Sequence, residues 1–253
     1  MIYLKSRKIL FIKPLKTAST SLEIALSCNA TSDDVVTPIS LSSELLRLKM
    51  KGQLPINYLD NSSDINYRKK ILLIEKFSEW FPNIKPENFD KFFKLFYKTR
   101  GKRVFYNHIK PEEISRSKGE EFLKDSFIVT MCRHPYEVLV SRIYWEKWKK
   151  QRVSEFDMKS EIDKMLKAPA LNYDYYFYQE KYLPSFVIRY EHLNDDLREL
   201  EKKFDLKLIE NMPLTKNDVR SSKKPAYEVL TDEQKELCYA KNKKIFECFS
   251  YEK

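Results

Sequence analysis

Short apolar runs followed by helix-like stretches recur along this chain. Residues 9–12 form such a run, which ends before Pro14, and residues 21–26 just beyond it have the spacing of a helix. Residues 127–131 repeat the apolar run, and residues 136–150 follow with apolar side chains, Trp145 among them, on one helical face. The pattern therefore predicts two strand, loop and helix units.

A third unit follows farther along the chain. Residues 186–189 have the pattern of a strand, and residues 195–204 have helical spacing, with Asn194 available as the N-cap. Strands that alternate with helices are typical of a mostly parallel sheet with helices on both faces. We therefore expect a three-layer α/β fold.

Residues 33–100 interrupt this alternation. They lack a convincing strand pattern, whereas residues 71–81 and 89–97 carry apolar side chains at helical spacing. We interpret the segment as a helical insertion that covers the sheet.

The C-terminal region is expected to close the fold with a helix over residues 230–249. Thr231 and Gln234 form a capping-box pattern at its start. The sequence contains no internal repeat and no Gly/Ser linker, so we predict a single domain over residues 1–253.

The composition favours anionic partners. Lys and Arg number 47 against 37 Asp and Glu, which gives a formal net charge of +10. Such a charge suits nucleic acid, an anionic membrane surface, an acidic polysaccharide or a nucleotide with several phosphates. Charge alone does not choose among them.

Sequence features of secreted and membrane proteins are weak. The four cysteines are scattered, and no CxxC pair indicates zinc. The apolar run at residues 9–12 is too short for the core of a signal peptide or for a membrane span. We expect a cytoplasmic protein with no metal and no membrane partner.

A run of short side chains follows the first predicted strand: Lys16, Thr17, Ala18, Ser19, Thr20 and Ser21. At a helix start, free backbone N–H groups and the helix dipole favour an anion, and hydroxyl groups add donors. Lys16 adds an ammonium that can follow charge on a departing oxygen. The alternative is that Ser19 or Thr20 only caps the helix. An ordinary ATPase or GTPase loop is disfavoured because the glycines of GxxxxGK are missing.

Arg133 and Ser141 form a second candidate phosphate site. Arg133 follows the second predicted strand and can bind a phosphate through two N–H groups. Ser141 lies two turns into the next helix, on a face that can turn toward the same ligand. The alternative is that Arg133 makes a structural ion pair and Ser141 is a neutral helix residue.

Together these two segments resemble the nucleotide site of sulfotransferases that use 3′-phosphoadenosine 5′-phosphosulfate (PAPS). Residues 14–22 are similar to the 5′-phosphosulfate loop of that family, and residues 132–142 are similar to its 3′-phosphate motif. Leu15 replaces a frequent proline, and Ala18 replaces a frequent glycine, as in uronosyl 2-O-sulfotransferases. The resemblance implies a P-loop-NTPase-like sulfotransferase fold with PAPS as co-substrate and 3′-phosphoadenosine 5′-phosphate (PAP) as product. Because alanine takes positive φ only at a cost, we expect a loop conformation that suits an L-residue at Ala18.

His108 is the candidate general base. Residues 103–106 have a strand pattern and Pro111 opens a helix, which predicts that His108 is exposed at a turn. A histidine titrates near neutral pH and can take the proton of a hydroxyl group. Residues 107–114 also resemble the stretch that carries the base in carbohydrate sulfotransferases. The alternative is a histidine that only hydrogen-bonds a neighbouring loop.

Four further residues are weaker candidates. Ser222 and Lys223 precede the last helix, where sulfotransferases often complete the 3′-phosphate site, although a solvated basic loop fits equally well. Glu191 follows the third strand and either serves the active site or orients backbone groups. His134 lies inside the phosphate motif, where packing or nucleotide contact is expected rather than a role as base.

These patterns predict sulfuryl transfer from PAPS to an acceptor hydroxyl group of a carbohydrate, with His108 as base and Lys16 stabilising the departing phosphate. Small alcohols, phenols and peptide tyrosines remain open as acceptors, and no oligomeric state follows from the sequence. The rival functions are a nucleotide-dependent phosphotransferase, a basic nucleic-acid-binding module and a sulfotransferase fold that binds ligand without turnover. No nucleic-acid partner is expected under the main prediction.

Overall fold

A computed structural model describes residues 1–60, 65–93, 101–149, 156–213 and 224–253. Its main sheet has five strands in the order β3-β1-β2-β4-β7. These strands are β1 (Ile2–Leu4), β2 (Ile9–Phe11), β3 (Val35–Val36), β4 (Phe127–Cys132) and β7 (Phe186–Arg189). β2, β4 and β7 pair in parallel, as the three strand, loop and helix units predict. β1 is antiparallel to both of its neighbours, so the sheet is mixed rather than mostly parallel.

The antiparallel part of the sheet was not predicted. The 3₁₀ turn Lys5–Arg7 and Lys8 at φ 53° reverse the chain between β1 and β2. β3 lies inside the segment that was interpreted as purely helical. A strand of two residues such as β3 is too short to show a period along the sequence, so its pairing partner rather than local pattern defines it.

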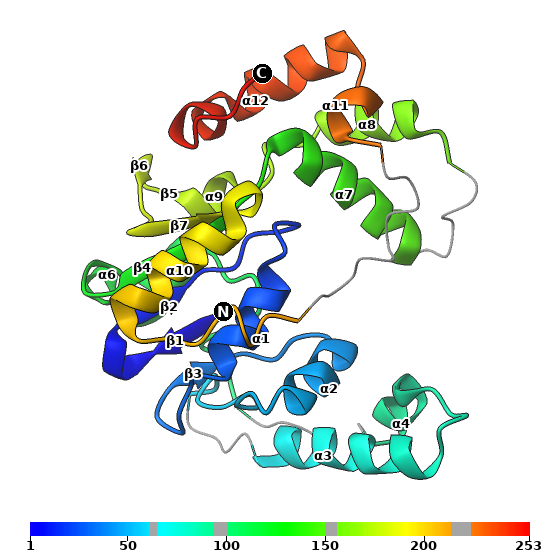
Figure 1. The fold of residues 1–253 in the computed structure, drawn as a ribbon, viewed down its shortest axis with the longest axis vertical. Coiled ribbons are helices and arrows are strands. Elements are labelled where there is room, and N and C mark those ends of the chain that lie inside the picture. The colour runs from blue at the N-terminus through cyan, green and yellow to red at the C-terminus, as the bar shows by residue number, and fades with distance from the viewer. Residues whose placement is uncertain (61–64, 94–100, 150–155, 214–223) are drawn as a thin grey trace.

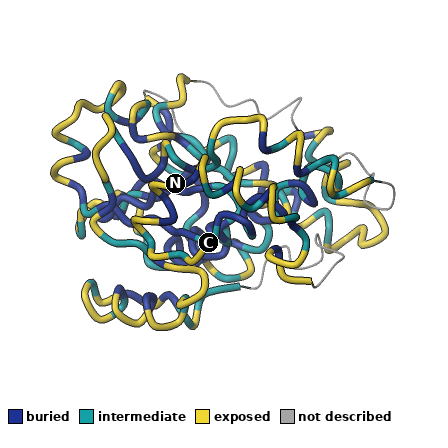
Figure 2. The backbone as a smooth tube through the Cα atoms, turned by 90° about the horizontal axis from the view of Figure 1, so that it is seen from above, coloured by how far each residue is buried: buried dark blue, intermediate teal, exposed yellow. Residues whose placement is uncertain are grey.

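Helices cover both faces of the sheet (Figure 1). Helices α1 (Ser19–Ser27) and α10 (Leu193–Phe204) pack on the face that carries Ile9 and Phe11. Helices α5 (Pro111–Lys118) and α6 (Glu120–Lys124) pack on the face that carries Leu10. Since successive side chains of a strand point to opposite faces, a fully apolar strand such as β2 needs cover on both sides. Figure 2 shows the buried stretches gathered in the interior.

A further group of helices packs beside the sheet around its own apolar cluster. Its members are α7 (Pro135–Lys149), α8 (Met158–Leu166), α11 (Ala226–Val229) and α12 (Asp232–Cys248). The predicted capping box is confirmed, because Thr231 and Gln234 exchange side-chain and backbone hydrogen bonds at the start of α12. A short turn, α9 (Tyr173–Tyr176), leads into the hairpin of β5 (Phe177–Tyr178) and β6 (Lys181–Tyr182).

Three helices make up most of the described part of residues 33–100: α2 (Leu41–Lys49), α3 (Ile65–Trp80) and α4 (Pro86–Phe93). They lie at the β3 end of the molecule in Figure 1, and α2 packs against α1. The expectation of helices here is confirmed, apart from β3; residues 94–97, predicted as the end of the second helix, lie outside the described residues. No helix in the described ranges is long and apolar enough to cross a membrane.

Two local predictions were wrong. Residues 103–106 do not form a strand, because only Arg103 makes an isolated bridge, with Leu59. Asn194 does not cap α10, since the 3₁₀ turn Tyr190–His192 runs directly into a helix that begins at Leu193. A residue inside the first turn cannot serve as the cap that precedes it.

Candidate functional site

A cavity of about 180 Å³ lies where β2 and β4 end and α1 and α7 begin. Its described lining residues are Leu15, Lys16, Ala18, Ser19, Thr20, His108, Arg133, Ser141, Arg142, Trp145 and Tyr190. Seven of the candidates named from sequence are in this set. They meet because the carboxyl ends of parallel strands lie at one edge of a sheet, where loops and helix starts form ligand sites.

The loop that enters α1 has an unusual backbone. Lys16 and Ala18 have φ of 62° and 61°, while Thr17 between them has negative φ. Alternation of left- and right-handed residues turns successive N–H groups inward and makes an anion-binding concavity. The start of the nine-residue helix α1 follows at once, so its dipole adds to the same potential.

Ala18 corrects the prediction about loop conformation. We expected the loop to spare an alanine the left-handed region, yet Ala18 occupies it at φ 61°, ψ 12°. Left-handed backbone costs an L-residue roughly 1–2 kcal/mol. The surrounding contacts therefore over-determine the loop, as is common where a backbone must present N–H groups.

The hydroxyl groups of the loop do not all face the cavity. Ser19 Oγ donates to the carbonyl oxygen of Pro14 at 2.8 Å, which closes the loop on itself. Thr17 is fully buried, and its Oγ1 has no hydrogen-bond partner within the described part of the chain. Ser21 is buried in the first turn of α1. Backbone N–H groups, Thr20 and Lys16 are thus the groups best placed for an anion.

Trp145 holds the side chain of Lys16. The Lys16 ammonium lies 4.7 Å from the centroid of the Trp145 ring, and Trp145 stacks on Trp148 with centroids 5.0 Å apart. Trp145 was predicted only as part of an apolar helical face. Its place four residues after Ser141 puts both on one side of α7 and was the available signal for a site role.

Arg133 combines both interpretations made from sequence. Its Nη2 pairs with Glu137 Oε2 at 2.8 Å, which is the structural ion pair of the alternative. Its guanidinium also lies 4.3 Å from the ring of Tyr190 and lines the cavity. The Nε atom has no hydrogen-bond partner among the described residues. A buried donor of this kind is costly unless a ligand or water accepts from it. Sequence reasoning did not select Tyr190 as a site residue.

The cavity is positively charged. Lys16, Arg133 and Arg142 line it. Arg142 lies one residue after Ser141 on α7 and pairs with Glu146 at 2.6 Å. Glu137 and Glu146, the acidic partners of Arg133 and Arg142, are not among the described lining residues.

His108 lies in the cavity wall but is half-buried rather than exposed. Its Nδ1 lies 2.9 Å from the carbonyl oxygen of Lys13, and its own carbonyl oxygen accepts from Tyr175 Oη at 3.0 Å. Burial, assisted by the charge of Lys13, lowers the pKa of His108 to about 4. The imidazole is therefore neutral at pH 7, and because a carbonyl only accepts, Nδ1 carries the hydrogen and Nε2 the lone pair.

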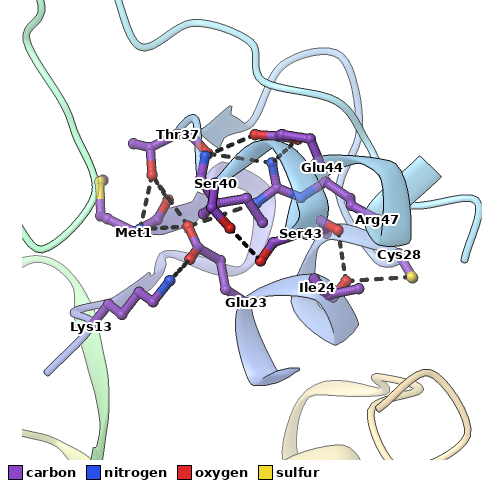
Figure 3. A network of polar contacts seen from close by, with 12 residues as sticks. Met1, Lys13, Glu23, Ile24, Cys28, Thr37, Ser40, Ser43, Glu44 and Arg47 are labelled. Atoms are coloured by element: carbon purple, nitrogen blue, oxygen red, sulfur yellow. Dashed lines mark hydrogen bonds and ion pairs between the residues drawn. The ribbon is translucent and has the colours of Figure 1, made fainter. Parts of the chain in front are cut away.

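Lys13, whose carbonyl oxygen contacts His108, also belongs to a buried cluster of charges (Figure 3). Glu23 of α1 accepts from Lys13 Nζ at 2.6 Å and from the Met1 ammonium at 2.7 Å. Arg47 of α2 lies 3.7 Å from Glu23 and pairs with Glu44 at 2.9 Å. Burial alone would raise the pKa of Glu23, but the three cations hold it well below its ordinary value. The cluster ties α1, α2 and the end of β2 together.

The weaker candidates have structural roles or are undescribed. Glu191 accepts from the backbone N–H of His134 at 2.8 Å and from Tyr251 Oη at 3.0 Å, so it orients backbone as the alternative holds. The ring of His134 packs against Tyr136, Phe246 and Tyr251 and is not among the described lining residues. Ser222 and Lys223 lie outside the described residues.

Within the described ranges, no group of three or more His, Cys, Asp or Glu side chains is arranged to hold a metal ion. No family model, curated protein or solved structure matches this chain. The geometry of the cavity and the resemblance of its loops therefore carry the functional argument.

Proposed function

We propose that the protein transfers a sulfuryl group from PAPS to a hydroxyl group of a carbohydrate, on a P-loop-NTPase-like sulfotransferase fold. The observation that carries the proposal is that two distant segments of the chain converge on one cavity. Lys16 and Ala18, from the segment similar to a phosphosulfate loop, and Arg133 and Ser141, from the segment similar to a 3′-phosphate motif, line one cavity with His108.

The residues present suit a ligand with several phosphate groups. The loop at Lys16 and Ala18 has the alternating φ of an anion-binding backbone, and α1 begins directly after it. On the other side, Arg133 has a buried Nε with no partner in the described residues. Two anion sites in one cavity fit a nucleotide phosphorylated at both its 3′ and 5′ positions.

The proposed reaction is an in-line displacement at sulfur. Nε2 of His108 takes the proton of the acceptor hydroxyl group, and the acceptor oxygen forms a bond to sulfur. The bond between sulfur and the bridging phosphate oxygen breaks, so PAP leaves with the additional negative charge. Lys16 and the N–H groups of the loop stabilise that charge. No redox partner is needed for this balance.

The acceptor class follows from the cavity wall at α7. Trp145 lines the cavity, and Trp148, which is 49% exposed, stacks on it and extends the aromatic surface beyond the lining residues. Sugar rings pack on such surfaces through their apolar faces, and the nearby Arg142 suits an acidic sugar. We propose residues 33–100 as the cover on the acceptor side.

Thermal unfolding with and without PAP tests the nucleotide site. PAP at 100 times its dissociation constant adds about 2.7 kcal/mol, which raises the midpoint by roughly 5–11 °C for a chain of this size. Lys16→Met and Arg133→Met should lose most of the rise, while the exposed Arg198→Met is the matched control. A rise with ATP equal to that with PAP would favour a phosphotransferase, and no rise with PAP would overturn the proposal.

A transfer assay then tests the base. With PAPS and a panel of uronic-acid oligosaccharides, simple phenols and tyrosine peptides, His108→Asn should lower kcat at least about 100-fold. Its PAP-dependent rise in the unfolding midpoint should persist. Loss of both properties would contradict the role given to His108.

A further inference from the structure

One short turn contacts two loops of the cavity and the strand that leads to a third. Asn172 and the first helical residues after it, Tyr173–Tyr176, form this turn far from the loops in sequence. The side chain of Asn172 bonds to the backbone of Leu15, Tyr175 Oη donates to the carbonyl oxygen of His108, and Tyr176 Oη donates to that of Met131. Their targets belong to the loop of Lys16, the turn of the candidate base and the strand that leads to Arg133.

The Asn172 side chain pairs with the Leu15 backbone as a neighbouring strand would, because it both accepts and donates a hydrogen bond there. Its Oδ1 accepts from the Leu15 N–H at 2.8 Å, and its Nδ2 donates to the Leu15 carbonyl oxygen at 2.8 Å. Both polar backbone groups of the residue that precedes Lys16 are thereby satisfied. Asn172 is 6% exposed and has φ 70°, a conformation that asparagine tolerates better than most residues. The amide is therefore buried and held in one orientation.

Tyr175 acts on the other half of the site. His108 has φ 60°, so its backbone is held in a sparsely populated region, and Tyr175 bonds to it at 3.0 Å. Burial raises the pKa of Tyr175 to about 12, far above neutral pH, and its protonated hydroxyl group donates to the carbonyl oxygen. The Lys13 carbonyl fixes the imidazole at Nδ1, so backbone and ring of His108 are fixed by two different elements.

We propose that Asn172 and Tyr175 are positioning residues with separate tasks. Asn172 sets the anion-binding loop through Leu15, and Tyr175 sets the candidate base through the backbone of His108. The assignment rests on the proposed function for its kinetic consequences. The contacts themselves predict structural effects that are measurable without nucleotide or acceptor.

The test compares Asn172→Gly, Tyr175→Phe and the control Tyr173→Phe. Glycine tolerates the positive φ of position 172, so this substitution removes the side chain without adding backbone strain. Tyr173 lies in the same turn and its hydroxyl group contacts Glu180 and Lys244 rather than a loop of the cavity. Amide hydrogen exchange and an NMR titration of His108 are recorded on each full chain without ligand.

Asn172→Gly should speed exchange of the Leu15 amide, whose N–H donates to Asn172 Oδ1, about tenfold or more and raise the PAP dissociation constant by a similar factor. The titration of His108 should not move. Tyr175→Phe should leave the dissociation constant of PAP within about twofold, move the titration midpoint of His108 upward from near 4, and lower kcat about tenfold.

Equal effects of the two variants on both readouts, or effects no larger than those of Tyr173→Phe, would overturn the proposal that Asn172 and Tyr175 have separate tasks. If Asn172→Gly fails to fold, Asn172→Asp keeps the acceptor for the Leu15 N–H and removes only the donor to its carbonyl oxygen. It should then raise the PAP dissociation constant without moving the titration of His108, while the Leu15 amide keeps its acceptor. The predicted split in a protein that neither binds PAP nor transfers sulfate would support the positioning roles and overturn the proposed function.

Discussion

The carbonyl oxygen of Lys13 accepts a hydrogen bond from Nδ1 of His108 at 2.9 Å, while the side chain of Lys13 pairs with Glu23 at 2.6 Å. One residue just after β2 thus contacts both the candidate base and α1, the helix that follows the candidate anion-binding loop. The bond to the carbonyl selects the tautomer in which Nε2 carries the lone pair.

Stability should fall in mild acid because of His108. In the unfolded chain its imidazole takes up a proton near its ordinary pKa of 6.5, and in the folded chain only at a pKa of about 4. Between these values the unfolded state binds more protons, so the free energy of unfolding falls as pH falls from 6.5 to 4. Above pH 6.5 the His108 imidazole is neutral in both the folded and the unfolded chain, so it contributes no pH dependence to the free energy of unfolding.

Denaturant unfolding from pH 7 to 4 measures this effect. The wild type should lose on the order of 3 kcal/mol more than His108→Asn across that range. Asparagine suits the φ of 60° at this position and retains a donor for the Lys13 carbonyl. Parallel pH profiles for the two proteins would show that His108 is not held neutral.

Glu23→Gln should destabilise the protein strongly. It leaves the buried Lys13 ammonium without the carboxylate that pairs with it, and removal of one partner from a buried pair costs about 3–5 kcal/mol. Chemical denaturation at neutral pH measures the loss. Glu121→Gln, which breaks an exposed pair with Lys124, is the control and should cost less than about 1 kcal/mol. Similar losses for both would contradict the structural role of the buried cluster.

Ala18→Gly should stabilise the protein. Relief of left-handed strain outweighs the added freedom of glycine in the unfolded chain, for a net gain of about 0.5–1 kcal/mol. The thermal midpoint measures this gain as roughly 1–4 °C. Ala168→Gly is the control, because Ala168 is exposed and does not have positive φ, and it should give no gain. A loss at position 18 would mean that packing of the methyl group dominates over backbone strain.

Nucleotide binding should change the fluorescence of Trp145. A phosphate group in the loop draws the Lys16 ammonium away from its place 4.7 Å from the Trp145 ring, and a charge that close influences indole emission. A titration with PAP records the change. Trp145→Phe should abolish it, whereas Trp80→Phe, on the exposed end of α3, should preserve it. An unchanged response in Trp145→Phe would place the nucleotide away from Lys16.

Local pattern was enough for the three parallel strands and the helices that follow them. The strand at residues 186–189 was predicted with its observed bounds, and the capping box at Thr231 was correct in detail. These signals are apolar runs bounded by turn residues and cap residues at helix starts. Each depends only on a few neighbouring residues, so it can be recognised without knowledge of the fold. The same local signals predicted the candidate anion-binding loop between β2 and α1.

Sequence alone determined which segments become the strands, loops and helices around the cavity, and which residues there carry charge. Tertiary structure decided the pairing of β1, the left-handed backbone of Ala18 and the convergence of Trp145 and Tyr190 on Lys16 and Arg133. Asn172 shows the reason, because it satisfies the backbone of Leu15 from 157 residues away. Such contacts depend on where the folded chain brings distant groups together, and no local periodicity encodes that.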